Sequence, residues 1–153
     1  MKRVCGVGVL LVLFGTMAYA QEGETWETQE PVWDVTTIRI LPNMEEQYLN
    51  NLRKTWVGSM EMAKKEGLIT DYKILSSVVS NAEGYNLMLI IHYPNLAALD
   101  ATATLREKWM KLDKELEKVV PKSQAETITS TVYPKVRDIE NEKLLREIKF
   151  LNK

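Results

Sequence analysis

The sequence predicts a single α+β domain, in which a four-stranded antiparallel sheet carries two helices on one face and a further helix follows at the C-terminus. The chain has 153 residues, of which 45% are hydrophobic and 27% charged, and this suits one folded domain. Strand-like and helix-like segments follow one another in the order β-α-β-β-α-β. Between the two middle strands, residues 81–84 (NAEG) have the composition of a tight turn, which predicts an antiparallel hairpin.

The N-terminal segment, residues 1–20, has the three parts of a secretory signal peptide. Two basic residues precede an apolar run over residues 4–14, and small residues lead to a cleavage site after Ala20. The apolar run is too short to predict a membrane span. Cys5 is the only cysteine of the chain and lies inside this segment, so the mature protein would hold no disulfide. We therefore expect a periplasmic or secreted protein.

The mature chain is predicted to begin with a leader and the first two elements of the domain. Residues 21–31 contain four glutamates and little apolar content, which is typical of a flexible acidic leader. Residues 32–41 are mostly β-branched and end at Pro42, which predicts the first strand. A helix is expected over residues 43–67, ending at Gly67, because apolar residues recur there at helical spacing.

The remaining elements follow the same reasoning, and the domain is expected to span residues 32–133. Residues 69–80 and 85–93 predict the two strands of the hairpin, and a second helix is expected from Leu96 to just before Pro121. Residues 126–133 (ETITSTVY) are Thr-rich and predict the fourth strand. The tail, residues 134–153, is expected to form a C-terminal helix with apolar residues along one side: Ile139, Leu144, Leu145, Ile148 and Leu151.

This element order is the ferredoxin-like, or split βαβ, plan, and its third strand also predicts the oligomeric state. A sheet with helices on one face only should alternate apolar and polar side chains, but residues 87–93 are apolar on both faces. A second copy of the sheet would cover the second face, so we expect a homodimer. The alternative is a monomer in which the C-terminal helix folds back across that face.

Four segments of the chain carry a resemblance to a known family: VTTIRILP, NMEEQYLNNLRKTW, GLITDYKILSS and YNLMLIIHYPNLAALD. Over residues 32–133 the sequence resembles the dimeric α/β-barrel superfamily, in particular its antibiotic-biosynthesis-monooxygenase-like branch. The resemblance implies the ferredoxin-like fold and a dimer. The superfamily includes cofactor-free monooxygenases, haem-degrading enzymes, isomerases and many uncharacterised proteins, so membership alone does not define an activity.

His92 is the only histidine and therefore the first candidate for proton transfer. In the catalytic interpretation it acts as a general base, or as a haem ligand, in the space between sheet and helices. In the structural interpretation it is a half-buried strand residue held by hydrogen bonds. One histidine and no cysteine in the mature chain do not provide a zinc, copper or iron–sulfur site, so we expect no metal and no cofactor.

Aromatic side chains provide a candidate ligand pocket, because sites for small apolar molecules are mostly apolar with a few polar groups. Asn86 lies six residues from His92 on the same strand face, but roughly 20 Å away, so the two are too distant to act together on one small substrate. In the alternative interpretation the aromatic residues simply form the core. The candidate ligand-binding residues are Trp56, Tyr72, Tyr85, Asn86, Tyr93 and Trp109.

The preferred functional hypothesis is therefore a periplasmic or secreted homodimer that binds a small apolar or aromatic ligand between sheet and helices. No nucleophile motif or glycine-rich phosphate loop occurs, and the net charge of −1 argues against nucleic-acid binding. Binding is favoured over catalysis because the sequence offers a base without an oxyanion partner. One alternative is a cofactor-free monooxygenase or isomerase that uses His92. Another is an envelope module that binds a protein partner through the leader or the terminal helix.

Overall fold

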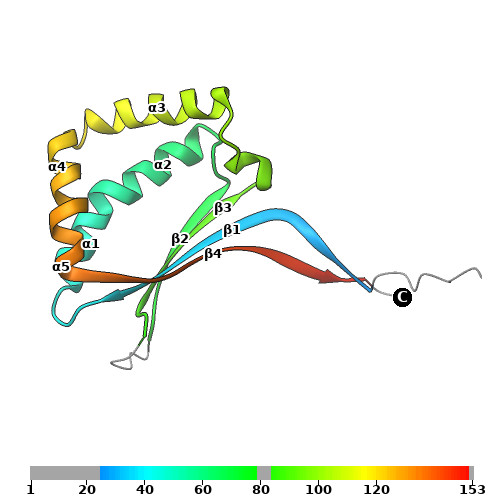
Figure 1. Ribbon diagram of the computed structural model, residues 1–153, viewed down its shortest axis with the longest axis horizontal. Helices are drawn as coiled ribbons and strands as arrows, with labels where there is room; N and C mark the ends of the chain where they lie inside the picture. Colours follow the sequence, from blue (N-terminus) through cyan, green and yellow to red (C-terminus); the bar gives the residue numbers. More distant parts are fainter. Residues whose placement is uncertain (1–24, 79–83, 152–153) are drawn as a thin grey trace, which may run out of the picture.

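The computed structural model describes residues 25–78 and 84–151, which form one sheet with helices packed on one side of it (Figure 1). The predicted signal peptide lies outside the described residues, as do the first four residues of the predicted leader. The strands are β1 (Trp26–Ile40), β2 (Asp71–Ser76), β3 (Leu87–Tyr93) and β4 (Arg137–Phe150). Their order in the sheet is β2-β3-β1-β4, and all three neighbouring pairs are antiparallel. This is the strand order of the predicted ferredoxin-like fold.

The first predicted helix forms as α1 (Glu45–Leu52) and α2 (Gly58–Lys65), joined by a π-helical turn, Arg53–Val57. A short 3₁₀ helix (Leu96–Leu99) leads into α3 (Ala103–Glu117). The chain then turns through α4 (Lys122–Thr127), a second π-helical turn (Ile128–Val132) and α5 (Tyr133–Val136), which runs directly into β4. No helix in the described part of the chain is long and apolar enough to cross a membrane.

The fourth strand predicted over residues 126–133 is wrong, because this segment is helical. Ile128 and Tyr133 are five residues apart, and the π-helical turn brings both into the core with Val136. The local Ser and Thr hydroxyls donate back to carbonyl oxygens of the preceding turn, as Ser130 does to Glu126 at 2.6 Å. Burial of these apolar groups therefore outweighs the strand propensity of the segment.

The C-terminal helix predicted over residues 134–153 is also wrong, because residues 137–150 form β4. This strand pairs with β1 along its whole length, from Ile40 opposite Arg137 to Trp26 opposite Phe150. It supplies the fourth strand of the fold, and it is the edge of the sheet. The leader prediction fails in its second half for the same reason, since residues 26–31 belong to β1.

Beyond the body of the domain, β1 and β4 continue as a two-stranded ribbon, which Figure 1 shows extending away from the helices. Pairing of β1 with β3 reaches only from Ile38 to Val32, and beyond it Trp26, Glu27 and Thr28 pair with β4 alone. We call residues 26–31 and 147–150 the arm. At its base the register shifts, and the Arg146 guanidinium donates to the carbonyl oxygen of Gln29 at 2.7 Å.

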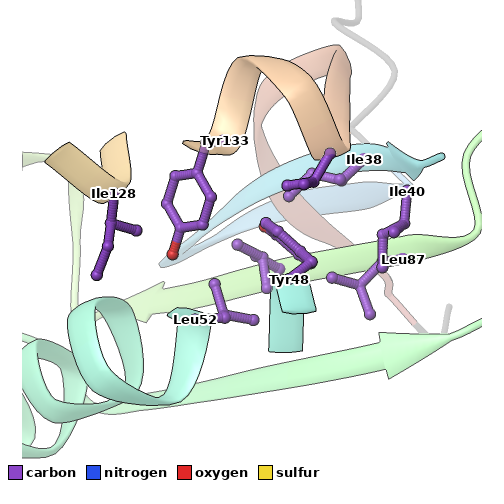
Figure 2. Close-up of a cluster of buried hydrophobic side chains, with 9 residues drawn as sticks. Ile38, Ile40, Tyr48, Leu52, Leu87, Ile128 and Tyr133 are labelled. Atoms are coloured by element: carbon purple, nitrogen blue, oxygen red, sulfur yellow. The ribbon is translucent and has the colours of Figure 1, made fainter. Parts of the chain in front are cut away.

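The core lies between the sheet and the helices, in two neighbouring clusters of buried side chains. Figure 2 shows the first, in which Tyr48 and Leu52 of α1 meet Ile38 of β1 and Tyr133 of the last helical segment. The second cluster joins Val32 and Tyr93 to α2 and α3. Trp56 packs against both clusters, so the two parts of the core are continuous along the first helix.

The phenol of Tyr48 leads to a first prediction. Its side chain is fully buried, and its hydroxyl has no hydrogen-bond partner among residues 25–78 and 84–151. Because an unsatisfied buried hydroxyl costs free energy, Tyr48→Phe should raise the free energy of unfolding by about 1 kcal/mol. Urea denaturation at pH 7 measures this. An unchanged or lower stability would mean that the hydroxyl is hydrogen-bonded in solution.

The same substitution should change the alkaline branch of the stability curve. Burial raises the pKa of Tyr48 from 10.0 to about 12. A raised pKa in the folded state means that its stabilising contribution is complete below pH 10 and is lost as the pH rises towards 12. Tyr48→Phe should therefore lose less stability over that interval than the unmodified protein.

Candidate functional site

The face of the sheet that carries no helices is the candidate site, and we call it the open face. Alternation along the strands defines it: Val32 and Tyr93 point into the core, so Trp33 and His92, which face each other across β1 and β3, point the opposite way. β3 therefore carries apolar side chains on both of its faces, as predicted. The open face carries Trp33, Val35 and Thr37 of β1, Lys73 and Leu75 of β2, Met88, Ile90 and His92 of β3, and Lys143 and Leu145 of β4.

His92 lies on this open face and not in the space between sheet and helices, where the catalytic interpretation placed it. Its ring stacks on Trp33 with 4.1 Å between the ring centroids, and its Nδ1 lies 2.6 Å from the Thr70 hydroxyl. The ammonium group of Lys73 lies 5.6 Å from the centre of the Trp33 ring, on a neighbouring part of the same face. These contacts hold His92 in one orientation, and they agree with the structural interpretation.

The hydrogen bonds of Thr70 also define the chemistry that His92 can offer. The Thr70 hydroxyl donates to the backbone oxygen of His92 at 2.8 Å, which uses its single hydrogen. It then accepts from Nδ1–H of the ring, and the other ring nitrogen, Nε2, is left as a hydrogen-bond acceptor. His92 is thus equipped to accept a proton or a hydrogen bond from a ligand on the open face.

Asn86 does not complement His92, because its amide bonds to the main chain. The side-chain oxygen accepts from the backbone N–H of Ile40 at 2.8 Å, and the side-chain nitrogen donates to the backbone oxygen of Ile40 at 3.0 Å. Asn86 also donates its own backbone N–H to Ile38 at 3.0 Å. This residue ties the start of β3 to the end of β1, which is a structural role.

Four of the predicted ligand-binding residues lie on the helix side of the sheet and pack together. Trp56 and Tyr72 meet edge to face, with 5.4 Å between the ring centroids. Tyr93 is buried in the second core cluster, and Trp109 packs against it from α3. The Tyr72 hydroxyl donates to the carboxylate of Glu61, which with partial burial raises the pKa of Tyr72 to about 12. These side chains fill the core, as the alternative interpretation of the aromatic set held.

Tyr85, the remaining residue of the predicted set, is exposed and lines a pocket on the open face. The pocket has a volume of about 370 Å³ and lies over β1 and β4. Its walls combine apolar side chains with an amine, an amide and a carboxylate, which is the composition of many small-molecule sites. The lining residues are Val35, Thr37, Tyr85, Glu140, Asn141, Lys143 and Leu145.

Ion pairs lie at the margins of the open face. Arg39 contacts Asp138 at 2.7 Å and Glu140 at 3.0 Å, next to the pocket. On the other edge strand, Asp71 at the start of β2 contacts Lys64 at 2.7 Å, and this hydrogen bond lowers the pKa of Asp71. These pairs are solvent-exposed and contribute little to stability, but they leave the centre of the face apolar.

Sequence reasoning missed several residues of this face. Trp33, Val35 and Leu145 were not among the predicted site residues, although Trp33 and Val35 are two positions apart and alternate with Val32, which points into the core. That alternation was a usable signal on β1. Leu145 gave none, because its segment was predicted to be helical. No group of three or more histidine, cysteine or acidic residues that could hold a metal occurs in the described part of the chain.

Comparisons with known proteins yield structural similarities only. No protein-family model matches the chain, and no curated protein matches it. A protein from Shewanella oneidensis is similar in structure at 12% identity and a TM-score of 0.48, covering 81% of this chain and 98% of that one. A dimeric protein of unknown function and ferredoxin-like fold from Bacteroides fragilis is similar at 13% identity and a TM-score of 0.41, covering 81% of this chain and all of that one. The ferredoxin-like fold is assigned here from the strand order of the sheet.

Proposed function

We propose that this protein is a periplasmic or secreted homodimer, in which two copies pack open face against open face and hold a small apolar or aromatic ligand between them. The observation that carries the proposal is the apolar centre of the open face. A sheet face that meets water only is expected to be polar, whereas this one places Leu145 opposite Trp33 and Ile90 opposite Val35, so apolar side chains adjoin across three strands.

The structure favours a second copy as the cover for this face. The competing explanation was a monomer in which a C-terminal helix folds across the sheet, but residues 137–150 form β4 and are part of the sheet themselves. A two-fold axis through the open face pairs the same apolar patch with itself, so one surface serves both subunits. The proposed dimer therefore does not depend on a C-terminal helix.

The ligand would occupy the open-face pocket and not the space between sheet and helices, which packed aromatic side chains fill. A partner sheet laid over this pocket would convert a surface depression into an enclosed cavity. Val35, Tyr85 and Leu145 suit the flat apolar body of such a ligand, and Lys143 suits an acidic or hydrogen-bond-accepting group on it. We therefore propose a small aromatic or apolar molecule with one polar end.

Binding is proposed in preference to catalysis because of what surrounds His92. Its Nε2 is a competent acceptor, but Asn86, the amide predicted to lie on the same strand face, is bonded to Ile40. Proton-transfer enzymes need a base and a hydrogen-bond donor within reach of one reacting atom. Secretion is part of the proposal because of the charged, apolar and small-residue segments that lead to Ala20.

The dimer is tested by placing a charge among the apolar side chains of the open face. Leu145 is 47% exposed in the single chain, so Leu145→Asp should fold normally but should raise the dimer dissociation constant at least tenfold, measured by analytical ultracentrifugation. Leu49→Asp is the matched control, because Leu49 is a 43% exposed leucine on α1, away from the sheet. A monomeric unmodified protein, or equal effects of the two substitutions, would contradict the proposed interface.

The ligand is tested by native mass spectrometry on protein purified gently from its own source. We expect a mass that corresponds to two chains plus a small molecule, and loss of that molecule in the Leu145→Asp protein. A dimer without a bound molecule, which also binds no molecule from a small-aromatic library, would leave the dimer in place and remove the ligand from the proposal.

A further inference from the structure

The arm is amphipathic, although it lies outside the body of the domain. Trp26 pairs with Phe150, and Thr28 pairs with Ile148, so these four side chains share one face of the ribbon. Glu27 pairs with Lys149 on the other face, which is polar. Phe150 is 76% exposed, and none of the arm's apolar side chains belongs to either core cluster.

A two-stranded ribbon with an uncovered apolar face is not stable by itself in water. Isolated pairs of strands are marginal unless a third strand or a helix packs on them. Within the described part of the chain, neither β3 nor β2 pairs with the arm, because β3 ends its pairing with β1 at Val32. The apolar face of the arm therefore needs a cover from outside the body of the domain.

We propose that the arm of each protomer packs its apolar face onto the second copy in the homodimer, so that the two subunits exchange arms across the two-fold axis. This inference rests on the homodimer proposed above. It adds a second contact region to that dimer, made by residues 26–31 and 147–150, which is separate from the centre of the open face.

The area that a stable dimer buries supports a second copy of the chain as the surface on which the arm packs. The sheet is roughly 19 Å wide across four strands and roughly 23 Å long over the length of β3, so the open face has a footprint of roughly 450 Å². Stable interfaces bury about 800 Å² on each partner. One arm, roughly 20 Å long and 10 Å wide, adds roughly 200 Å². Since each protomer gives one arm and receives another, the total reaches roughly 850 Å².

The length of the arm fits the same geometry. Its six residues on β1 extend roughly 20 Å beyond the last residue pair of β1 with β3. This equals the width of one four-stranded sheet, so an arm is long enough to cross a partner sheet from edge to edge. The register shifts between Thr28 and Val32, where the Arg146 guanidinium donates to the carbonyl oxygen of Gln29. This shift gives the ribbon a bend at the point where it leaves the body of the domain.

The proposal is tested by a charge on the apolar face of the arm. Phe150→Asp should raise the dimer dissociation constant about 100-fold, because both copies of the side chain lose their contact in each dimer. Lys149→Ser, on the polar face of the same strand, is the matched control and should change the constant less than threefold. Circular dichroism should show the same fold in both variants, since neither residue belongs to a core cluster.

The outcomes separate this inference from the proposed dimer. If Leu145→Asp dissociates the dimer while Phe150→Asp does not, the open-face dimer stands and the arm proposal is overturned. If the unmodified protein is a monomer at micromolar concentration, both fail. If Phe150→Asp dissociates the dimer and Leu145→Asp does not, the arm contacts a second copy elsewhere than beside the open face, and the proposed open-face interface fails.

Hydrogen exchange provides a readout that does not depend on a variant of the arm. Amide hydrogens of residues 26–30 and 147–150 should exchange at least tenfold more slowly in the dimer than in the Leu145→Asp monomer, because a packed arm opens less often. Equal exchange of the arm in the two samples would overturn the proposal.

Discussion

Replacement of Ile38 by alanine is expected to lower the free energy of unfolding by about 3–4 kcal/mol. Ile38 is 0% exposed and packs with Tyr48 and Leu52 in the cluster shown in Figure 2. The substitution removes three buried carbon atoms and leaves a cavity between β1 and α1, where two rigid elements meet and cannot close it fully. Urea denaturation, followed by circular dichroism, gives the value.

Ile139 is the matched control for this substitution. It is the residue opposite Ile38 on β4, but it is 57% exposed. Ile139→Ala should cost less than about 1 kcal/mol, because water already contacts most of its surface. Equal losses at the two positions would mean that Ile139 is buried in solution as Ile38 is, and they would contradict its exposure on the edge strand β4.

Replacement of Asn86 by alanine is the second large effect, with an expected loss of about 2–3 kcal/mol. The substitution leaves both the N–H and the oxygen of Ile40 without their partner in a partly buried position. Asn86→Asp keeps an acceptor for the Ile40 N–H but loses the donor to its oxygen, so an intermediate or equal loss is expected.

Asn141→Ala is the control for the amide, since Asn141 is an exposed residue of β4. Its change should stay within about 0.5 kcal/mol. If Asn86→Ala instead left stability unchanged and weakened the binding of a ligand, the assignment of Asn86 to a structural role would be wrong.

The sequence was sufficient for the first three strands and the two long helices. Period-two and period-3.6 spacing is strong in these segments, as in Tyr48, Leu52 and Met60 on the first helix, and local spacing and burial agree there. The predicted antiparallel hairpin is confirmed, since β2 and β3 are antiparallel neighbours, whereas residues 81–83 of the predicted turn lie outside the described residues.

The C-terminal third was predicted with its helix and strand exchanged, and tertiary contacts explain both errors. Residues 126–133 favour a strand by composition, but Ile128 and Tyr133 bury against α1 only from a helix. Residues 137–150 are rich in good helix formers, yet they pair with a strand that lies about a hundred or more positions earlier in the chain. Such distant pairing has no local signal, and neither does the arm that it creates.

Only that part of the candidate site that depends on alternation along one strand could be predicted. The alternation of β3 correctly indicated two apolar faces, but the catalytic interpretation placed His92 between sheet and helices, whereas it lies on the open face with Ile90. The sequence could not indicate that the aromatic set would divide across the sheet, with Trp56 in the core and Tyr85 on the open face. That division depends on the depth at which each helix packs, which spacing along one element does not reveal.

The pairing of β1 with β4 has a consequence for how the protein folds. These two strands make the most extensive contact in the sheet, and they lie at opposite ends of the described chain. Closing so long a loop costs entropy before any hydrogen bond repays it, so folding should be slow for a domain of this size, in the range of milliseconds to seconds. The sheet is incomplete until residues 137–150 have been synthesised, so β1 has no partner on that side before then, and the segments between the two strands must stay soluble without a complete sheet.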